Sequence, residues 1–227
     1  MREVIVIAEG QTEEQFIKRL IAPSLRRLQV FVKPQLLRTS KDSKGGAITF
    51  DRLRFNARNT LRSKSNLFLT TFIDLYALDT DFPRFDEANK KADLYDKVNI
   101  LENALYDTLM EQVGFQPPDR FIPYIQPYEF EGLLFSDIEA QTSVEPSWIN
   151  YLIKLKQVRN EFETPEHINQ GYATKPSKRL EDLLKPTYHK TRHGPLAAER
   201  ITLSTIELEC RHFREWMDKL RGLTHIV

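Results

Sequence analysis

Two short apolar runs constrain the fold of this chain more than any other feature of its sequence. Residues 4–7 (VIVI) and 66–73 (NLFLTTFI) are rich in β-branched and apolar side chains and do not alternate with charged ones. Strands that are buried on both faces have this pattern, which is typical of a parallel sheet with helices on either side. The sequence therefore predicts an α/β fold built on a mostly parallel sheet.

Helix and strand signals follow one another along the rest of the chain. Apolar residues recur at helical spacing over residues 49–62, and Thr12 with Gln15 has the pattern of a helix N-cap. The other expected elements are a strand over 30–37, in which Pro34 indicates a sheet edge, a polar loop over 40–46, helices over 86–113 and 128–137, a strand over 121–126, and helices near 145–159, 177–185 and 195–220. We expect an α/β domain over residues 1–140 and a helical C-terminal layer over 141–227 packed on it.

Composition argues against several classes of protein. Cys210 is the single cysteine, so the chain cannot form an internal disulfide or a multi-cysteine metal site. No apolar run reaches the roughly 18 residues of a membrane span, and the N-terminal run is too short for a signal peptide. We therefore expect a cytoplasmic protein with no membrane partner.

The formal net charge of +1 gives no overall attraction to nucleic acid. Neither the Walker A motif nor the dinucleotide-binding glycine motif occurs, so the chain is not expected to bind ATP by itself.

Acids follow three of the predicted strands. Glu9 follows the first strand, Asp74 ends the run over 66–73, and Glu129 and Glu131 come just after the strand over 121–126. The carboxyl ends of parallel strands meet at one edge of a sheet, where ligands bind in open α/β folds. Carboxylates brought together there repel one another unless a cation or a proton compensates them. Oxygen ligands suit Mg²⁺ or Mn²⁺, and two such ions promote hydrolysis of a phosphodiester.

Each of these acids also has a simpler interpretation. An acid after a strand is commonly a helix cap or a solvated loop residue. Glu129, and Glu13 as a further candidate ligand, can merely favour the positive N-terminus of a helix. Glu129 and Glu131 would share one face in a strand but point in roughly opposite directions in a helix. The metal-site hypothesis depends on several of these acids meeting in space.

The order of these motifs resembles the Toprim domain, which topoisomerases, bacterial primases and overcoming-lysogenization-defect nucleases share. The resemblance rests on Glu9-Gly10-x-Thr12-Glu13 after the first strand and on the strand that ends at Asp74. More closely, the segments VIVIAEGQTEEQFI, TFIDLYALDTDFP and IQPYEFEGLLFSD are similar to an uncharacterised Toprim-like family encoded beside ATPases in bacterial antiphage operons. The resemblance covers residues 1–140, and the segments 175–179 (KPSKR) and 190–194 (KTRHG) are also similar to that family.

The resemblance implies roles for several acids. Glu9 matches the Toprim glutamate, a metal ligand or general acid/base, and Asp74 matches the first aspartate of the Toprim Asp-x-Asp pair. Tyr76 stands where the second aspartate is expected, and this departure removes one metal ligand. Glu129 and Glu131 are then expected to compensate. The same resemblance implies an ATPase partner protein and a role in antiphage defence.

Two groups of basic residues are candidates for binding the phosphates of nucleic acid. One is a stripe at successive i, i+4 positions of the helix over 49–62, and the other lies where a loop opens the helix near 177. They are Arg54, Arg58 and Arg62, and Lys175, Lys178 and Arg179. Phosphate contacts position nucleic acid without reading its sequence. The arginine stripe is equally consistent with a solvated helix face.

Two histidines are candidate metal ligands or proton carriers. His189 and His193 are four residues apart, but Gly194 and Pro195 argue against a regular helix there, so a zinc pair is not expected. His193, expected in a loop, is instead a candidate for proton transfer or phosphate binding.

These observations lead to one functional hypothesis and two rivals. The first is a Mg²⁺- or Mn²⁺-dependent nuclease, or nuclease-like effector, that acts on DNA or RNA with an ATPase partner. Its catalytic residues would be Glu9, Asp74 and Lys178, and homo-oligomerisation is left open. The main rival is a catalytically degenerate Toprim-like module that regulates the ATPase, for which Tyr76 is the best support. Phosphotransfer, as in the primase branch of Toprim proteins, is the other.

Overall fold

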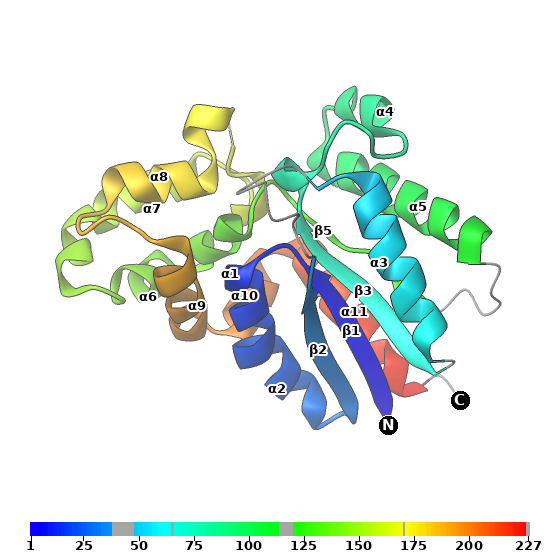
Figure 1. Ribbon diagram of the computed structural model, residues 1–227. Helices are drawn as coiled ribbons and strands as arrows, with labels where there is room; N and C mark the ends of the chain where they lie inside the picture. Colours follow the sequence, from blue (N-terminus) through cyan, green and yellow to red (C-terminus); the bar gives the residue numbers. More distant parts are fainter. Residues whose placement is uncertain (38–47, 65, 114–119, 170, 226–227) are drawn as a thin grey trace.

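The computed structural model describes residues 1–37, 48–64, 66–113, 120–169 and 171–225, and it has an α/β fold (Figure 1). Its sheet is parallel, in the order β2-β1-β3-β4, with β5 also paired to β3. The strands are β1 (Arg2–Ala8), β2 (Val30–Leu36), β3 (Leu67–Asp74), β4 (Phe121–Ile122) and β5 (Ile125–Gln126). The predicted parallel sheet is confirmed. The predicted loop over 40–46 lies outside the described residues.

The strands behave as their sequences indicate, with one interruption. Every residue of β3 is buried, and β2 lies at the sheet edge, as Pro34 suggested. The strand expected over 121–126 is divided in two at Pro123, which has no N–H to donate to the sheet. Thr71 bridges the gap, because its Oγ1 accepts a hydrogen bond from the Tyr124 N–H at 2.8 Å and donates one to the Tyr124 carbonyl at 2.7 Å.

One face of the sheet is covered by α3 (Phe50–Ser63), α4 (Phe85–Asn89) and α5 (Leu94–Val113), which share an apolar cluster with Ile7, Leu69 and Ile73. The helix predicted over 49–62 is confirmed. The single helix predicted over 86–113 is wrong, because the helical conformation is interrupted between α4 and α5. Asp93 then starts α5 by accepting a hydrogen bond from the Asp96 N–H at 2.8 Å.

The N-terminal helical unit on the other face consists of α1 (Gln11–Phe16), a π-helical segment η1 (Ile17–Ile21) and α2 (Ala22–Arg26). Thr12 is buried inside α1, so its predicted role as an N-cap is wrong, and Gly10 precedes the helix instead. Pro23 lacks the N–H that would continue the regular ladder, and the Ala22 N–H donates to the Ile17 carbonyl in a widened turn.

The C-terminal part supplies the remaining helices of this face, so the predicted helical layer is confirmed. Its elements are η4 (Phe130–Ser136), α6 (Ile138–Thr142), η5 (Pro146–Tyr151), α7 (Leu152–Asn160), η6 (Pro165–His167), η7 (Tyr172–Thr174), α8 (Pro176–Leu183), α9 (Lys190–Ile201), α10 (Leu203–Glu209), α11 (Arg211–Gly222) and η8 (Leu223–His225). Outside this layer, a short 3-10 helix, η2 (Leu75–Ala77), follows β3. The helix predicted over 195–220 is wrong, because it is three helices. Thr202, with φ at +75°, and the extended Cys210 separate them.

Helix α11 joins the C-terminal layer to the sheet. The Trp216 indole N–H donates to Thr70 Oγ1 at 2.8 Å, and its ring stacks on Tyr124 with 4.5 Å between ring centroids. Glu166 holds the start of α11, because its carboxylate accepts hydrogen bonds from the N–H groups of His212 and Phe213, each at 3.0 Å. Residues before and after position 140 therefore belong to one apolar cluster. In the described part of the chain, each helix is too short or too polar to cross a membrane.

Candidate functional site

The ends of β1, β3 and β5 bring the predicted acids to one edge of the sheet. Strands β1 and β3 are parallel neighbours, so Glu9, directly after β1, and Asp74, the last residue of β3, leave the sheet side by side. Asp74 is also paired with Gln126 of β5, three positions before Glu129. The acid cluster formed here consists of Glu9, Glu13, Asp74, Glu129 and Glu131.

Asp74 and Glu13 are held in place by the backbone around them. Asp74 is 5% exposed, and its Oδ1 accepts a hydrogen bond from the Phe130 N–H at 2.8 Å. Glu13 lies in the first turn of α1 and is 7% exposed, since α1 packs against α9. A side chain at Gly10 would crowd it, because a Cβ there would lie 3.2 Å from Glu13 Oε2.

Glu129 and Glu131 enter the same cluster although they are two residues apart. Glu129 is extended (φ −146°, ψ 152°) and Glu131 lies in the first turn of the following 3-10 helix η4, so neither the strand nor the α-helix geometry considered from the sequence applies. Glu129 accepts hydrogen bonds from Lys175 Nζ at 2.8 Å and from the Ser177 N–H at 3.0 Å. Glu131 Oε1 accepts one from the Tyr188 hydroxyl at 3.2 Å.

Lys190, the first residue of α9, is the cation placed among these acids. Its Nζ lies 3.1 Å from Glu131 Oε2 and 3.7 Å from Glu129 Oε1, and its charge acts on the other three acids as well. Burial lowers the pKa of Lys190, but the surrounding acids raise it above its usual value, so the ammonium stays charged. Sequence reasoning did not select Lys190 as a site residue. The likeness of the segment 190–194 to the Toprim-like family was the signal that pointed to it.

The lysines compensate Glu129 more fully than Glu131. Burial raises the pKa of Glu129, but Lys190 and the hydrogen bond from Lys175 outweigh burial and hold that pKa below its usual value. Burial raises the pKa of Glu131 to about 7 in spite of Lys190. Glu131 therefore changes its protonation near neutral pH.

Glu9, Glu13 and Asp74 are the unpaired acids of the cluster. Burial raises the pKa of each, and the charges of neighbouring acids raise it further. Among the described residues, none of the three forms an ion pair with a lysine or an arginine. Glu9 Oε2 is a buried oxygen without a hydrogen-bond donor. Negative charge at this edge of the sheet is therefore incompletely balanced.

The unpaired acids fit a hard divalent cation by their chemistry, although they do not form a finished cage. The available ligands are carboxylate oxygens, which Mg²⁺ and Mn²⁺ prefer, and Glu9 Oε2 lacks a partner. Over the described ranges, no three His, Cys, Asp or Glu side chains are already arranged to coordinate one ion. Mg²⁺ commonly binds through one or two carboxylates and keeps several waters. The donor chemistry of these acids therefore suits such an ion, and the described side chains define no coordination geometry for it.

Of the three predicted basic residues around α8, Lys175 contacts the acid cluster, through Glu129. Lys178 Nζ pairs with Asp182 Oδ1 at 2.8 Å, one turn further along the same helix. Arg179 donates to the Thr174 carbonyl at 2.6 Å and lies over the ring of Phe162. Lys190 and Lys175, and not Lys178, are the lysines that the structure places beside the acids.

His193 is inside helix α9, so the loop expected there is wrong. The helix forms because α9 packs closely on its neighbours through Gly194, where a Cβ would lie 2.9 Å from Tyr188 Oη and 3.1 Å from Thr12 Cγ2. This packing overrides the local preference of Gly194 and Pro195 against a helix.

The His193 ring has a supporting position rather than an exposed one. It is 1% exposed, its Nδ1 accepts the His189 N–H at 2.9 Å, and it meets Trp148 edge-on. Burial lowers its pKa, which favours the neutral ring. His193 thus holds the start of the helix that carries Lys190, and it does not present its ring to a phosphate in this conformation.

The arginine stripe lies on α3, on the face of the sheet opposite α1 and α9 (Figure 1). Arg54 pairs with Asp51 at 2.8 Å, Arg58 is partly buried and Arg62 is exposed. Their contact with nucleic acid stays a prediction. Tyr76 is 41% exposed, and its ring lies 5.4 Å from that of Tyr128, so position 76 adds no ligand to the acid cluster.

Comparison with known proteins relates nearly the whole chain to one family. A family model described as "Domain of unknown function (DUF4276)" matches residues 8–221, a range that includes the acid cluster and Lys190. No curated protein and no solved structure matches the chain. Because the match covers far more than half of its length, the chain belongs to the DUF4276 family.

Proposed function

We propose that this chain is a Mg²⁺- or Mn²⁺-dependent enzyme that hydrolyses phosphodiester bonds of nucleic acid. The observation that carries the proposal is that buried Asp74, buried Glu13 and partly buried Glu9 gather around the ends of two adjacent strands without a paired cation. Burying carboxylates beside one another costs free energy unless an ion or a proton balances them. Such conflicts between stability and local chemistry are expected at functional sites. The resemblance of the same segments to Toprim nucleases supports the proposal.

Each residue has a defined part in the proposed site. Glu9 and Asp74 would hold the ion, with Glu13 as a further ligand, and a bound ion would polarise a phosphate oxygen and lower the pKa of a water molecule. Lys190 stays charged and its side chain is 40% exposed, so its ammonium can meet a phosphate oxygen. Glu131, with a pKa of about 7, can accept or donate a proton near neutral pH.

Lys190 also gives a physical reason why a second aspartate is not needed. In the Toprim pattern the residue at position 76 would supply a ligand to a second ion, but Tyr76 packs near Tyr128 instead. Lys190 already brings a positive charge to Glu129 and Glu131. The proposed site therefore uses one ion and one lysine.

The test combines cleavage with metal binding. Purified chain is incubated with DNA and with RNA in Mg²⁺, in Mn²⁺ and in EDTA, and metal binding is measured by calorimetry. Glu9→Gln and Asp74→Asn should each lose metal binding and reduce cleavage by about 10²-fold or more, a size typical of losing one electrostatic group from an active site. Lys190→Met should reduce cleavage while metal binding persists.

The matched control is Glu139→Gln, because Glu139 is an exposed acid that pairs with Lys156 on the surface. This variant should keep both cleavage and metal binding. Cleavage that survives both Glu9→Gln and Asp74→Asn would show that the acids do not carry the activity.

A second function is favoured by Tyr76: a Toprim-like module that has lost catalysis and regulates an ATPase partner. Such a module would show no metal binding that depends on Glu9 or Asp74. The ATPase partner and the role in antiphage defence rest on the family resemblance. They are tested by co-expressing the chain with an ATPase encoded beside it and measuring ATP hydrolysis with and without the chain. An unchanged rate and no co-purification would count against both.

A further inference from the structure

A groove at the edge of the sheet is separate from the acid cluster. It has a volume of about 580 Å³ and lies between the π-helical segment with α2 on one side and the edge strand β2 on the other. Its lining divides into an apolar part, which includes Pro23 and Phe31, and four exposed cations. The cations are Lys18, Arg26, Arg27 and Lys33.

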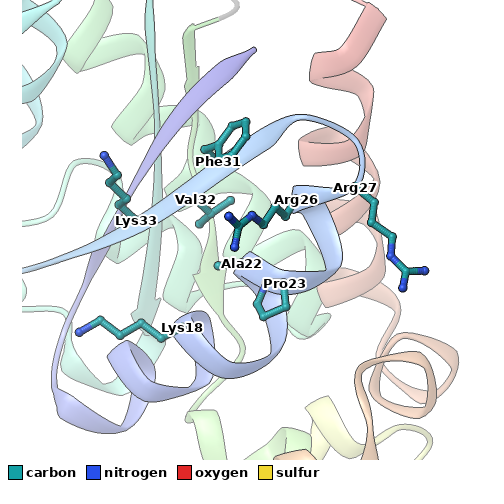
Figure 2. A pocket seen from close by; sticks show the side chains of 8 residues that line it. All are labelled: Lys18, Ala22, Pro23, Arg26, Arg27, Phe31, Val32 and Lys33. Atoms are coloured by element: carbon teal, nitrogen blue, oxygen red, sulfur yellow. The ribbon is translucent and has the colours of Figure 1, made fainter.

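Figure 2 shows how these side chains are arranged. The two lysines lie toward one end of the groove and Arg27 toward the other, with Pro23 and the other apolar residues between them. Arg26 lies between these two ends, among the apolar side chains. An apolar centre bordered by charged residues is common in protein–protein interfaces.

The edge strand itself is poorly suited to receive a further strand. The Leu37 N–H donates to the Ala8 carbonyl of β1, so by alternation Pro34 faces away from β1, toward the open edge. Pro34 has no N–H, and a proline on the outer side of an edge strand opposes pairing with another strand. A partner in the groove is therefore expected to bind through side-chain contacts and not by adding a strand to β2.

The positive charge of the groove is only partly balanced. Lys33 pairs with Glu3 at 2.9 Å, and Lys18 pairs with Glu14 of α1. Within the described part of the chain, neither Arg26 nor Arg27 takes part in an ion pair. Guanidinium groups bind carboxylates in a two-pronged geometry and are enriched at interfaces.

We propose that this groove binds an acidic, amphipathic helical segment of a partner protein. Apolar side chains of the segment fill the centre around Pro23 and Phe31, and its carboxylates pair with Arg26 and Arg27. A nucleic-acid strand fits less well, because phosphates gain nothing from an apolar floor and Phe31 alone is no stacking platform. The proposal does not depend on the acid cluster or on nuclease activity.

The experiment selects ligands for the full chain from a displayed library of random peptides several helical turns long. Peptides enriched by the wild type should combine acidic residues with apolar ones at i, i+3 and i+4 spacing. Selected peptides are then made with a fluorescent label, and binding is followed by anisotropy at low and high salt. The double variant Arg26→Glu/Arg27→Glu should weaken binding by about tenfold or more, and salt should weaken wild-type binding.

The control variant is Lys90→Glu/Lys91→Glu, which reverses two adjacent exposed lysines directly after α4, on the other face of the sheet. It should bind the peptides as the wild type does. Circular dichroism establishes that all variants remain folded, and Arg26→Gln/Arg27→Gln repeats the test without introducing negative charge. A labelled DNA oligonucleotide is the competing probe.

Three results would overturn the proposal. They are failure to enrich acidic peptides, equal binding to the charge-reversed and wild-type chains, and binding of DNA through Arg26 and Arg27 in place of peptide. The last result would assign the groove to nucleic acid. Loss of nuclease activity in the acid-cluster variants would leave the peptide result unchanged, so the two proposals fail independently.

Discussion

Replacing Glu131 by glutamine measures how much the protein loses by burying an acid at the end of its sheet. Glu131 is 1% exposed, and burial raises its pKa from 4.5 to about 7. Glutamine has nearly the same shape, and its amide oxygen can still accept the hydrogen bond from Tyr188. The substitution therefore removes the titrating group and its ion pair with Lys190, while the shape of the side chain stays nearly the same.

The expected change in the free energy of unfolding follows from the pKa of Glu131. Between pH 4.5 and about 7 the folded protein keeps a proton on Glu131 that the unfolded chain has released. The free energy of unfolding consequently falls as the pH rises through this range, and the full penalty, about 3 kcal/mol, is present above pH 7. Below pH 4.5 both states are protonated and the penalty vanishes. Glutamine resembles the protonated acid, so Glu131→Gln should be stabilising by up to about 3 kcal/mol at alkaline pH and nearly neutral at acid pH.

Urea denaturation followed by circular dichroism, in EDTA and over a series of pH values, measures this difference. Glu129→Gln is the matched control, because Lys190 and Lys175 hold the pKa of Glu129 below its usual value. Its ionised form therefore stabilises the fold, and Glu129→Gln should destabilise the protein at neutral pH, with an effect that fades as the pH falls. The reasoning is refuted if Glu131→Gln changes stability by the same amount at every pH, or if it destabilises the protein above pH 7.

Two further variants test the packing and the buried charges elsewhere. Gly194→Ala should gain up to about 1 kcal/mol of helix propensity, but a Cβ 2.9 Å from Tyr188 Oη costs about 1–3 kcal/mol of overpacking, so urea denaturation should show a net loss. A net gain would mean that α9 can move away from α1 at little cost. His212→Gln tests the contact between His212 and Glu102, whose side chains lie 2.8 Å apart. Burial lowers the pKa of His212, but Glu102 outweighs burial and raises that pKa above its usual value of 6.5. The charged ring therefore stabilises the fold fully below about pH 6.5, and this contribution is lost as the pH rises through the folded pKa. Thermal melts should show that the difference in Tm between wild type and variant becomes smaller as the pH rises. A difference in Tm that is the same at every pH would contradict this.

The sheet could be predicted from the sequence because its strands carry strong local signals. The run that became β3 is apolar on both faces, and Pro34 marks the edge strand because proline has no backbone N–H to donate to a neighbouring strand. Helix breaks were harder to predict. Apolar positions continue across the gap between α4 and α5, and the turn at Thr202 needs a positive φ that its residue type does not announce.

The same contrast holds for the candidate site. Glu9 and Asp74 could be found because each directly follows a strand, and neighbouring parallel strands bring their ends together. Lys190 could not be found in this way, because it lies far later in the chain, in a segment whose Gly194 and Pro195 indicate irregular structure. Only the packing of α9 against α1 and η4 makes that segment a helix and brings Lys190 to the acids.

The stacking of Trp216 on Tyr124, and its hydrogen bond to Thr70, have a consequence for the order of events during synthesis. Until residues 211–222 leave the ribosome, Tyr124 lacks the ring of Trp216, and Phe72 is packed against Phe16 of α1 but lacks Phe213 and Trp216. Thr70 of β3 and Tyr124 therefore reach their final packing only after α11 has been synthesised, although both precede it by more than eighty residues in the chain.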